Sequence, residues 1–326
     1  MRTALMPLDR YSTGMPTVVD VTLRDGGYAN DHQFSFDEAC ALVRGLADAG
    51  LPNIEVGYFT PSQPGDGRPT ACCPIDYLQA LAELRGRASL LVMAHAALVG
   101  LDAYARIAAA GVAAVRLPCS PAALPALRPH LVAIHEAGMR CSINLIRISE
   151  LAPQVVMACA RTAEAMGADW LYLADSNGML VPEDVFELVQ PVCAELSIPV
   201  GLHLHNGLGL SFINALYGLK AGARMIDGSL AGMGKGGGNL PLEVFAAYLN
   251  GIGGAFDIGR MVETAESGLS RWMGGVRESA TNAISSLLNL NLDAIADLRQ
   301  QSIRDQVPLL DLVSQRLSPA PAVALG

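Results

Sequence analysis

Thr17-Val-Val-Asp-Val-Thr-Leu23 is a short run rich in β-branched residues, and an Ala/Leu-rich helical pattern over residues 36–49 follows it. The two together predict one strand and the helix that returns from it. The same alternation continues along the chain, with further strand runs at 53–57, 89–93, 113–117, 140–146, 170–174, 199–205 and 224–230. Roughly eight strand–helix units in series predict an α/β fold, a parallel (β/α)8 TIM barrel rather than an open sheet.

Glycine follows several of the predicted helices, where a left-handed residue commonly ends a helix: Gly50, Gly111, Gly138, Gly167 and Gly222. From about residue 257 onward the pattern is helical and contains no strand run. We therefore expect a catalytic barrel over residues 1–255 and a small helical C-terminal region over residues 256–326.

Composition excludes several classes of protein. The 326 residues are 51% hydrophobic and carry a net charge of -9, without a basic run, so nucleic acid is not an expected partner. No stretch approaches the length of a membrane span, and the N-terminus lacks the apolar segment of a signal peptide. The seven cysteines are odd in number and mostly scattered, which argues against a disulfide framework and favours the reducing cytoplasm.

Polar residues gather where the predicted strands end. In a (β/α)8 barrel the active site forms at the C-terminal ends of the strands. The candidates on or just after the predicted strands are Arg24, Asp25, Glu55, His95, Arg116, Asn144, Arg147, Asp175, His203, His205 and Asn206.

His203-Leu-His205 is the sharpest of these signals. Residues two apart on a strand point to the same face, so both imidazoles can reach one ion. The carboxylate of Asp25 would complete three protein ligands and leave positions open for substrate and water. Such a set suits Mn²⁺, Fe²⁺, Co²⁺ or Zn²⁺, and also Mg²⁺. The alternative is a pair of hydrogen-bonded histidines in the barrel without a metal.

A glycine-rich loop follows the last predicted strand. Residues 232–237 read GxGxxG, which in a Rossmann fold would bind a dinucleotide. No further βαβ unit follows to complete such a fold, so we do not expect a dinucleotide. We expect a backbone loop over the barrel mouth, which either binds an anion or brings Asn239 near the metal.

Three segments resemble one superfamily. Asp20-Val-Thr-Leu-Arg-Asp-Gly26 resembles the first-strand motif of the metal-dependent lyase barrels. These include 3-hydroxy-3-methylglutaryl-CoA lyase, isopropylmalate synthase and 4-hydroxy-2-oxovalerate aldolase. The His203-to-Asn206 motif and the segment 227–245 also resemble this superfamily, and the latter looks like its aldolase branch. The resemblance covers roughly residues 16–250.

The resemblance implies roles for several of the candidates. Asp25, His203 and His205 would bind the metal, and Asn239 stands where some members supply a further ligand. Arg24 would stabilise an enolate oxygen. Mn²⁺ is the expected ion, with Mg²⁺, Co²⁺ and Zn²⁺ as alternatives. Further polar groups around the site would be Glu55, Asp175 and Asn206.

One position departs from the aldolase pattern. The 4-hydroxy-2-oxovalerate aldolases place a catalytic histidine three residues after the metal-binding aspartate, and this chain has Tyr28 there. A tyrosine hydroxyl gives up its proton readily only with help from neighbours or from a metal-bound water. His95 is an alternative base, or else a structural histidine in the mouth.

The expected reaction is an aldol or retro-aldol reaction of a 4-hydroxy-2-oxo acid through a pyruvate-type enolate, with a 2-oxo acid and an aldehyde as small-molecule partners. A substrate carboxylate would be clamped by Arg116 or Arg147, the alternative for either being an ion pair at the barrel end, and Asn144 is a further substrate-binding candidate. The alternatives are a Claisen-type acyltransferase, which condenses an acyl-CoA with a 2-oxo acid, and a non-catalytic barrel subunit. We expect a homo-oligomer. A dehydrogenase partner is a further expectation, drawn only from the resemblance.

Overall fold

The computed structural model describes residues 14–60, 67–272, 285, 288–314 and 316. Within this part of the chain, parallel strands form one closed barrel in which each strand pairs with the next and β8 pairs with β1. The strands are β1 (Thr17–Asp20), β2 (Asn53–Tyr58), β3 (Ser89–Met93), β4 (Val112–Cys119), β5 (Arg140–Leu145), β6 (Trp170–Asp175), β7 (Val200–Leu204) and β8 (Met225–Gly228). The predicted (β/α)8 barrel is confirmed.

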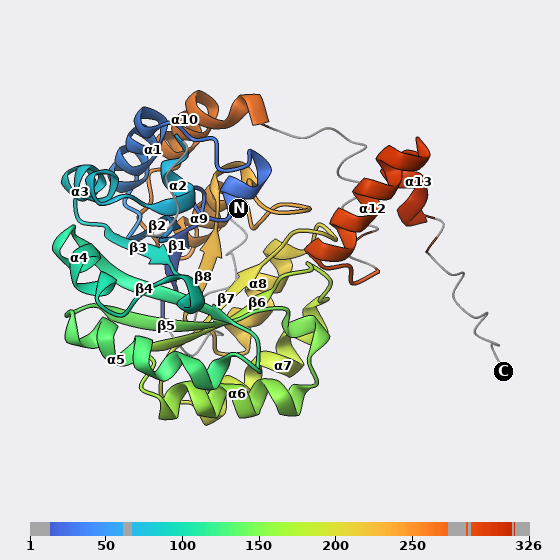
Figure 1. The fold of residues 1–326 in the computed structure, drawn as a ribbon, viewed down its shortest axis with the longest axis horizontal. Coiled ribbons are helices and arrows are strands. Elements are labelled where there is room, and N and C mark those ends of the chain that lie inside the picture. Colours follow the sequence, from blue (N-terminus) through green and yellow to red (C-terminus); the bar gives the residue numbers. More distant parts are fainter. Residues whose placement is uncertain (1–13, 61–66, 273–284, 286–287, 315, 317–326) are drawn as a thin grey trace, which may run out of the picture.

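A ring of helices surrounds the strands (Figure 1). Apolar side chains fill the layer between helices and strands, and a second buried cluster, which includes Val19, Leu91 and Tyr172, lies among the strands. The helices after the first seven strands are α1 (Phe36–Asp48), α3 (Ile75–Leu84), α4 (Ala103–Ala109), α5 (Arg128–Glu136), α6 (Pro153–Ala165), α7 (Pro182–Glu195) and α8 (Ser211–Lys220). Helix α9 (Leu242–Asn250) follows β8, and a short helix, α2 (Pro69–Cys72), lies between β2 and α3.

Helix α1 illustrates how the sequence sets the helix boundaries. Ser35 accepts a hydrogen bond from the Glu38 backbone and the Glu38 side chain accepts one from the Ser35 backbone, a capping box that satisfies two backbone donors. Gly50 follows the helix with φ +87°. The other four predicted helix-ending glycines also have positive φ, from +80° to +109°. These positions confirm the expected left-handed turns before the strands.

Strand β1 ends earlier than expected. It stops at Asp20, and the chain then turns so that the Asp25 backbone donates a hydrogen bond to the carbonyl of Val21. The Thr22 hydroxyl donates to the carboxylate of Asp20 and accepts from the backbone of Leu230, which ties this turn to the chain after β8. As a result Asp25, the predicted metal ligand, lies in a buried turn over the strand end.

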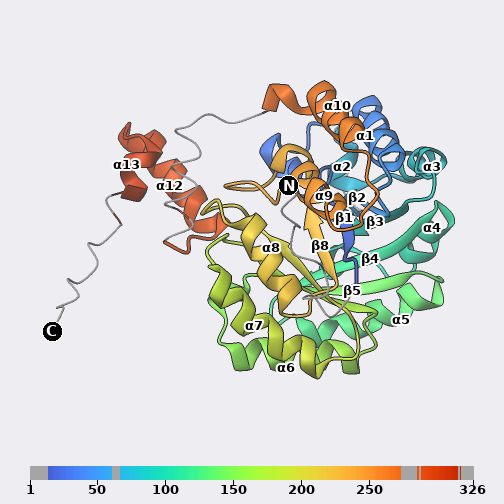
Figure 2. The same ribbon diagram turned by 180° about the vertical axis from the view of Figure 1, so that it is seen from behind.

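The C-terminal helices differ in their attachment. Helix α10 (Ile258–Leu269) packs against α1, and Gly45 of α1 allows a close approach to Thr264. Helices α12 (Leu292–Asp305) and α13 (Leu309–Ser314) lie beside the ring, as Figures 1 and 2 show. They share a small apolar cluster of their own. The boundary at residue 255 stays a prediction.

The described helices also bear on membrane insertion. None of them combines the length and the hydrophobicity that a bilayer crossing requires.

Candidate metal centre

Asp25, His203 and His205 converge at the C-terminal end of the barrel. One ligand atom from each lies within 4.8 Å of the others, and all three residues are buried. The Nε2 atom of His203 is 3.6 Å from one carboxylate oxygen of Asp25, and the Nε2 atom of His205 is 3.9 Å from the other. Two imidazole nitrogens and a carboxylate therefore face a common point, as a divalent cation requires.

The outer nitrogen of each imidazole is held by another group. Nδ1 of His203 lies 3.0 Å from the carboxylate of Asp227, and Nδ1 of His205 lies 3.3 Å from the carbonyl oxygen of Gly238. These acceptors favour protonation of Nδ1 and leave the Nε2 lone pair available. Acceptors behind metal-binding histidines commonly orient the ring in this way.

Asn239 is the candidate for a fourth ligand, through its side-chain oxygen. A backbone bridge pairs it with His205, and its side-chain amide donates to the carbonyl of Met233. Within the described residues, neither its Oδ1 nor Nε2 of His203 has a hydrogen-bond partner, although both atoms are buried. Leaving such atoms unpaired is costly, so this donor set fits a divalent cation.

The charge states of Asp25 and His205 also suit a metal. Burial alone would raise the pKa of Asp25, but Arg24 and the two histidines hold it well below its ordinary range. Burial lowers the pKa of His205 to about 3. A carboxylate and a neutral imidazole are the forms that bind cations. For His203, Asp25 and Asp227 outweigh burial and raise the pKa.

Arg24 lies beside Asp25, the candidate metal ligand. Its Nη1 donates to Asp25 at 2.6 Å and its Nε donates to Glu55 at 2.7 Å. Within the described residues Nη2 forms no hydrogen bond. The guanidinium is therefore held by two carboxylates and keeps one donor group for a substrate oxygen.

Aromatic side chains form the other half of the mouth. The hydroxyls of Tyr28 and Tyr58 are 2.9 Å apart, and the ring of His95 stacks on Tyr58. His32 packs edge-on against both tyrosines. Tyr28 and His95 are exposed, whereas His32 is buried. The predicted base candidates thus belong to one cluster, which Tyr58 joins.

Arg147 and Lys235 lie at the mouth near β5 and β6. Arg147 follows β5 with φ +57°, and its side chain is 3.8 Å from Asp293 at the start of α12. The Lys235 backbone donates to Asp25 at 3.4 Å and its ammonium donates to the Ser176 carbonyl. Two cations therefore stand where a substrate carboxylate could approach.

Arg116 lies elsewhere than expected. Strand β4 continues to Cys119, so Arg116 is inside the barrel and has no exposed surface. It donates to Glu55 at 3.1 Å and to Asp227 at 2.7 Å. Asn144, with its amide oxygen turned toward the guanidinium, accepts from Nη2 at 2.9 Å. The polar groups of Arg116 and Asn144 thus serve buried partners in this structure, and a substrate-binding role for either residue stays a prediction.

Asp175 and Asn206 support local backbone. Asp175 ends β6 and accepts a hydrogen bond from the backbone of Leu180. The side-chain oxygen of Asn206 accepts from both the backbone and the hydroxyl of Ser211, where α8 begins. These contacts hold the loops at the mouth and occupy the oxygen of Asn206.

Four residues near the site were missed: Asp227, Tyr58, His32 and Lys235. The sequence did carry a signal for three of them. Asp227 falls on a strand next to the two histidines, Tyr58 follows the run 53–57, and Lys235 lies in the glycine-rich loop. His32 gave none, because it occupies a turn with φ +55°.

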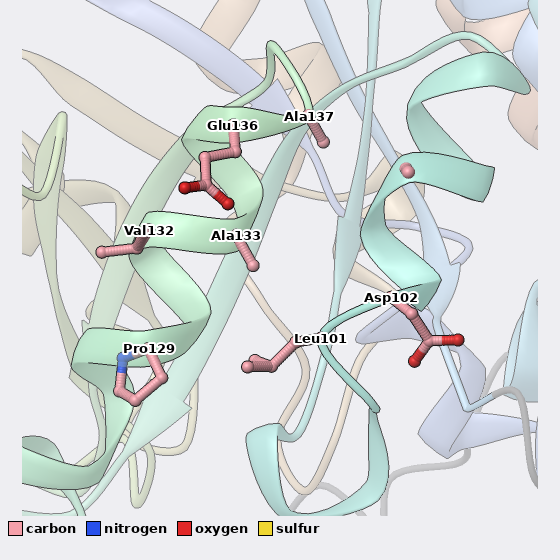
Figure 3. A pocket seen from close by; sticks show the side chains of 8 residues that line it. Leu101, Asp102, Pro129, Val132, Ala133, Glu136 and Ala137 are labelled. Carbon is pink, nitrogen blue, oxygen red and sulfur yellow. The ribbon is translucent and has the colours of Figure 1, made fainter.

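A pocket of about 540 Å³ lies outside this centre (Figure 3). Pro129, Val132 and Glu136 of α5 line one side, and Leu101 and Asp102 before α4 line the other. None of its lining residues is a candidate for the metal centre.

Comparison with known proteins agrees with this geometry. The 4-hydroxy-2-oxovalerate aldolase of Thermomicrobium roseum is 34% identical over 263 residues, which cover 77% of this chain and 72% of the relative. The protein of the same name from Thermus thermophilus is 32% identical over 273 residues, covering 80% and 77%. The crystal structure of the HMG-CoA lyase from Brucella melitensis superposes with a TM-score of 0.68 at 19% identity, covering 77% of this chain and 96% of that one, which shows a shared fold.

The family assignment rests on most of the chain. The HMGL-like family model matches residues 15–267, a range that contains the whole barrel and every predicted site residue. The resemblance to the metal-dependent lyase and aldolase barrels is thereby confirmed, and the chain belongs to the HMGL-like family.

Proposed function

We propose that this chain is a divalent-metal-dependent aldolase that makes or cleaves a 4-hydroxy-2-oxo acid. The observation that carries the proposal is the convergence of Asp25, His203 and His205, with ligand atoms within 4.8 Å of one another. The names of the relatives, 4-hydroxy-2-oxovalerate aldolases at 34% and 32% identity, support the substrate class.

Asp25, His203, His205 and Asn239 would hold the ion. Mn²⁺ is the first candidate, and Mg²⁺, Co²⁺ or Zn²⁺ would also suit a mixed nitrogen and oxygen set. Bound there, such an ion polarises the carbonyl of the 2-oxo acid as a Lewis acid. The ketone and carboxylate oxygens of the substrate would face the position of the ion.

Arg24 would stabilise the charge that develops during cleavage. Its guanidinium is held in place by Asp25 and Glu55 before the substrate arrives, so little reorganisation is needed. The free donor Nη2 would face the oxygen that becomes an enolate oxygen. Arg147 and Lys235, at the mouth near β5 and β6, would attract the substrate carboxylate.

The tyrosine pair would exchange the proton of the C4 hydroxyl. In the cleavage direction that hydroxyl loses its proton, the C3–C4 bond breaks, and an aldehyde and a pyruvate enolate form; C3 of the enolate then takes up a proton. The hydroxyls of Tyr28 and Tyr58, 2.9 Å apart, form a path along which one proton can pass. His95, stacked on Tyr58, is the second candidate for the base.

The substrates we propose are a small 2-oxo acid and an aldehyde. We also propose the cytoplasm as the location, a homo-oligomer as the assembly, and a dehydrogenase as a partner only if the aldehyde must be passed on directly. The acidic surface, with a net charge of -9, supports small-molecule rather than nucleic-acid partners.

The proposal can be tested without identifying the aldehyde. Purified protein with Mn²⁺ is incubated with pyruvate in D₂O, and deuterium in the methyl group is measured by mass spectrometry. We expect exchange that requires the metal and stops on chelation, because enolate formation is the step that the site would catalyse. Absence of both Mn²⁺ binding and exchange would favour the non-catalytic subunit instead.

A second assay separates the acyltransferase alternative. Acetyl-CoA and a 2-oxo acid are supplied, and release of the free thiol is followed. We expect no acetyl-CoA-dependent thiol release; its appearance would overturn the aldolase proposal.

A further inference from the structure

Six charged or ionisable side chains form a closed ring that includes two of the three candidate metal ligands. Around the ring stand Asp25, Arg24, Glu55, Arg116, Asp227 and His203, and His203 returns to Asp25. We call this set the charge ring. All six are buried, and they come from the β1 turn and from strands β2, β4, β7 and β8.

Five of the six contacts in the charge ring are 3.1 Å or shorter, and the sixth, from Nε2 of His203 to Asp25, is 3.6 Å. Arg24 reaches Asp25 at 2.6 Å and Glu55 at 2.7 Å. Arg116 then joins the same Glu55 oxygen, at 3.1 Å, to Asp227, at 2.7 Å. One oxygen of Asp227 accepts from both Arg116 and Nδ1 of His203. Each member therefore constrains the next, and two of the members, Asp25 and His203, are candidate metal ligands.

Stability alone is a poor explanation for this arrangement. Removing charges from water costs several kcal/mol per ion, and buried pairs repay that cost only with good geometry. Two charged members, Arg116 and Glu55, have no atom at the mouth and are completely buried. Within the described residues one oxygen each of Glu55 and Asp227 has no hydrogen-bond partner. Such a set is expensive to fold, which points to a role in the site.

We propose that Asp227 and Arg116 are positioning residues, which act through His203 and through Glu55 and Arg24 to set the geometry of the metal centre. This rests on the proposed function. Asp227 holds Nδ1–H of His203 and so directs Nε2 toward the cation. Arg116 holds Asp227 and Glu55, and Glu55 in turn orients the guanidinium of Arg24.

Arg116 is itself held on several sides. Its guanidinium lies 4.0 Å above the centre of the Tyr172 ring, and the side-chain oxygen of Asn144 accepts a hydrogen bond from it. Burial alone would lower the pKa of Arg116, but Asp227 and Glu55 outweigh it. The three carboxylates of the charge ring exceed its two guanidiniums by one negative charge when His203 is neutral. That excess favours a cation at the mouth.

The chain offers a matched control for Asp227. Asp169, just before β6 at the opposite end of the barrel, accepts from Nε2 of His135 at 2.9 Å and from the backbone of Cys141. It is a carboxylate–histidine pair of nearly the same length, without a metal ligand. Asp227→Asn and Asp169→Asn therefore make the same chemical change, the first inside the charge ring and the second outside it.

The experiment measures Mn²⁺ binding by isothermal titration calorimetry for the parent and both variants, together with the unfolding midpoint of each in the presence of a chelator. We expect Asp227→Asn to raise the Kd for Mn²⁺ about 10–100-fold, the usual cost of losing an acceptor behind a metal-binding histidine. Asp169→Asn should bind Mn²⁺ as the parent does. Equal binding by both variants would overturn the inference.

A second variant covers the case in which Asp227→Asn does not fold. Arg116→Lys keeps the charge but cannot hold Glu55 and Asp227 with one planar fork, so we expect the Kd to rise roughly tenfold. Deuterium exchange into pyruvate should fall in kcat more than KM changes, because Arg24 is displaced. If Arg116→Lys binds Mn²⁺ and exchanges as the parent does, the inference is wrong. If the parent protein itself binds no Mn²⁺, the proposed function is wrong.

Discussion

The metal half and the aromatic half of the barrel mouth are built in different ways. Asp25, His203 and His205 are buried and are held by ion pairs, hydrogen bonds and the charge ring below them. Tyr28 is 42% exposed, and its side chain is held by one hydroxyl contact and by ring edges. The first half is held by charges that cannot be removed singly, whereas the second is held by contacts that other residues can replace.

This difference bears on Tyr28, the position where the resemblance to the aldolases implies a histidine. A buried charge without its partner is strongly destabilising, so members of the charge ring can change only together. The exposed Tyr28 position carries no such penalty. A change from histidine to tyrosine there would leave the metal half intact and alter only how protons move.

The largest expected effect comes from breaking the metal half. His205→Ala removes an imidazole that faces Asp25, so Mn²⁺ binding should be lost and deuterium exchange into pyruvate should fall on the order of 10³-fold, since a Lewis acid supplies several kcal/mol. Calorimetry and the exchange assay check this. His135→Ala, outside the mouth, is the control. Retention of tight binding by His205→Ala would exclude this set of ligands.

Breaking the aromatic half should cost less. Tyr28→Phe removes the exposed hydroxyl and keeps the ring. We expect kcat for cleavage of a 4-hydroxy-2-oxo acid to fall about 10²-fold, at the low end for acid–base catalysis because Tyr58 and His95 remain. The Kd for Mn²⁺ should not change. If Tyr28→Phe keeps full activity and His95→Gln loses it, His95 is the base.

Tyr58→Phe tests whether the two hydroxyls work together. It removes the partner of Tyr28 but not Tyr28 itself, so the expected fall in kcat is about tenfold. In Tyr28→Phe/Tyr58→Phe the loss should be clearly smaller than the product of the single losses, because residues of one path do not act independently. Additive losses would show that Tyr58 only packs.

A smaller effect should appear in the pH dependence of stability. Burial, aided by the charge of Arg24, lowers the pKa of His32 to about 4. An unfolded histidine takes up a proton near pH 6.5, so this contribution to stability is complete above that pH and is lost as the pH falls toward 4. Between about pH 7.5 and 5.5 the free energy of unfolding of the parent should fall by roughly 1 kcal/mol more than that of His32→Gln. Urea unfolding with a chelator present measures this, and equal losses would contradict it.

Most of the fold follows from local patterns. The alternation of β-branched runs with amphipathic segments predicts the barrel, and the five helix-ending glycines mark where helices return to strands. The boundaries were less accurate. The apolar residues of the run 17–23 do not reveal that β1 ends at Asp20 and turns.

The site was predictable only where a motif spans a few residues. The spacing of His203 and His205 places both on one face, and the structure brings Asp25 to them. The charge ring was not predictable. Arg116 meets Glu55 across 61 residues and Asp227 across 111, and no local pattern encodes contacts at such separations.

Closure of the barrel between β1 and β8 has a consequence for synthesis of the chain. Asp25 leaves the ribosome early, but its partners His203 and His205 emerge only after most of the barrel has been made. Until then Asp25 is the one candidate ligand of the three that has been made, and a single carboxylate binds a divalent cation weakly. The ion therefore cannot template the early strands, which must pair without it; metal can stabilise only a chain that is nearly complete.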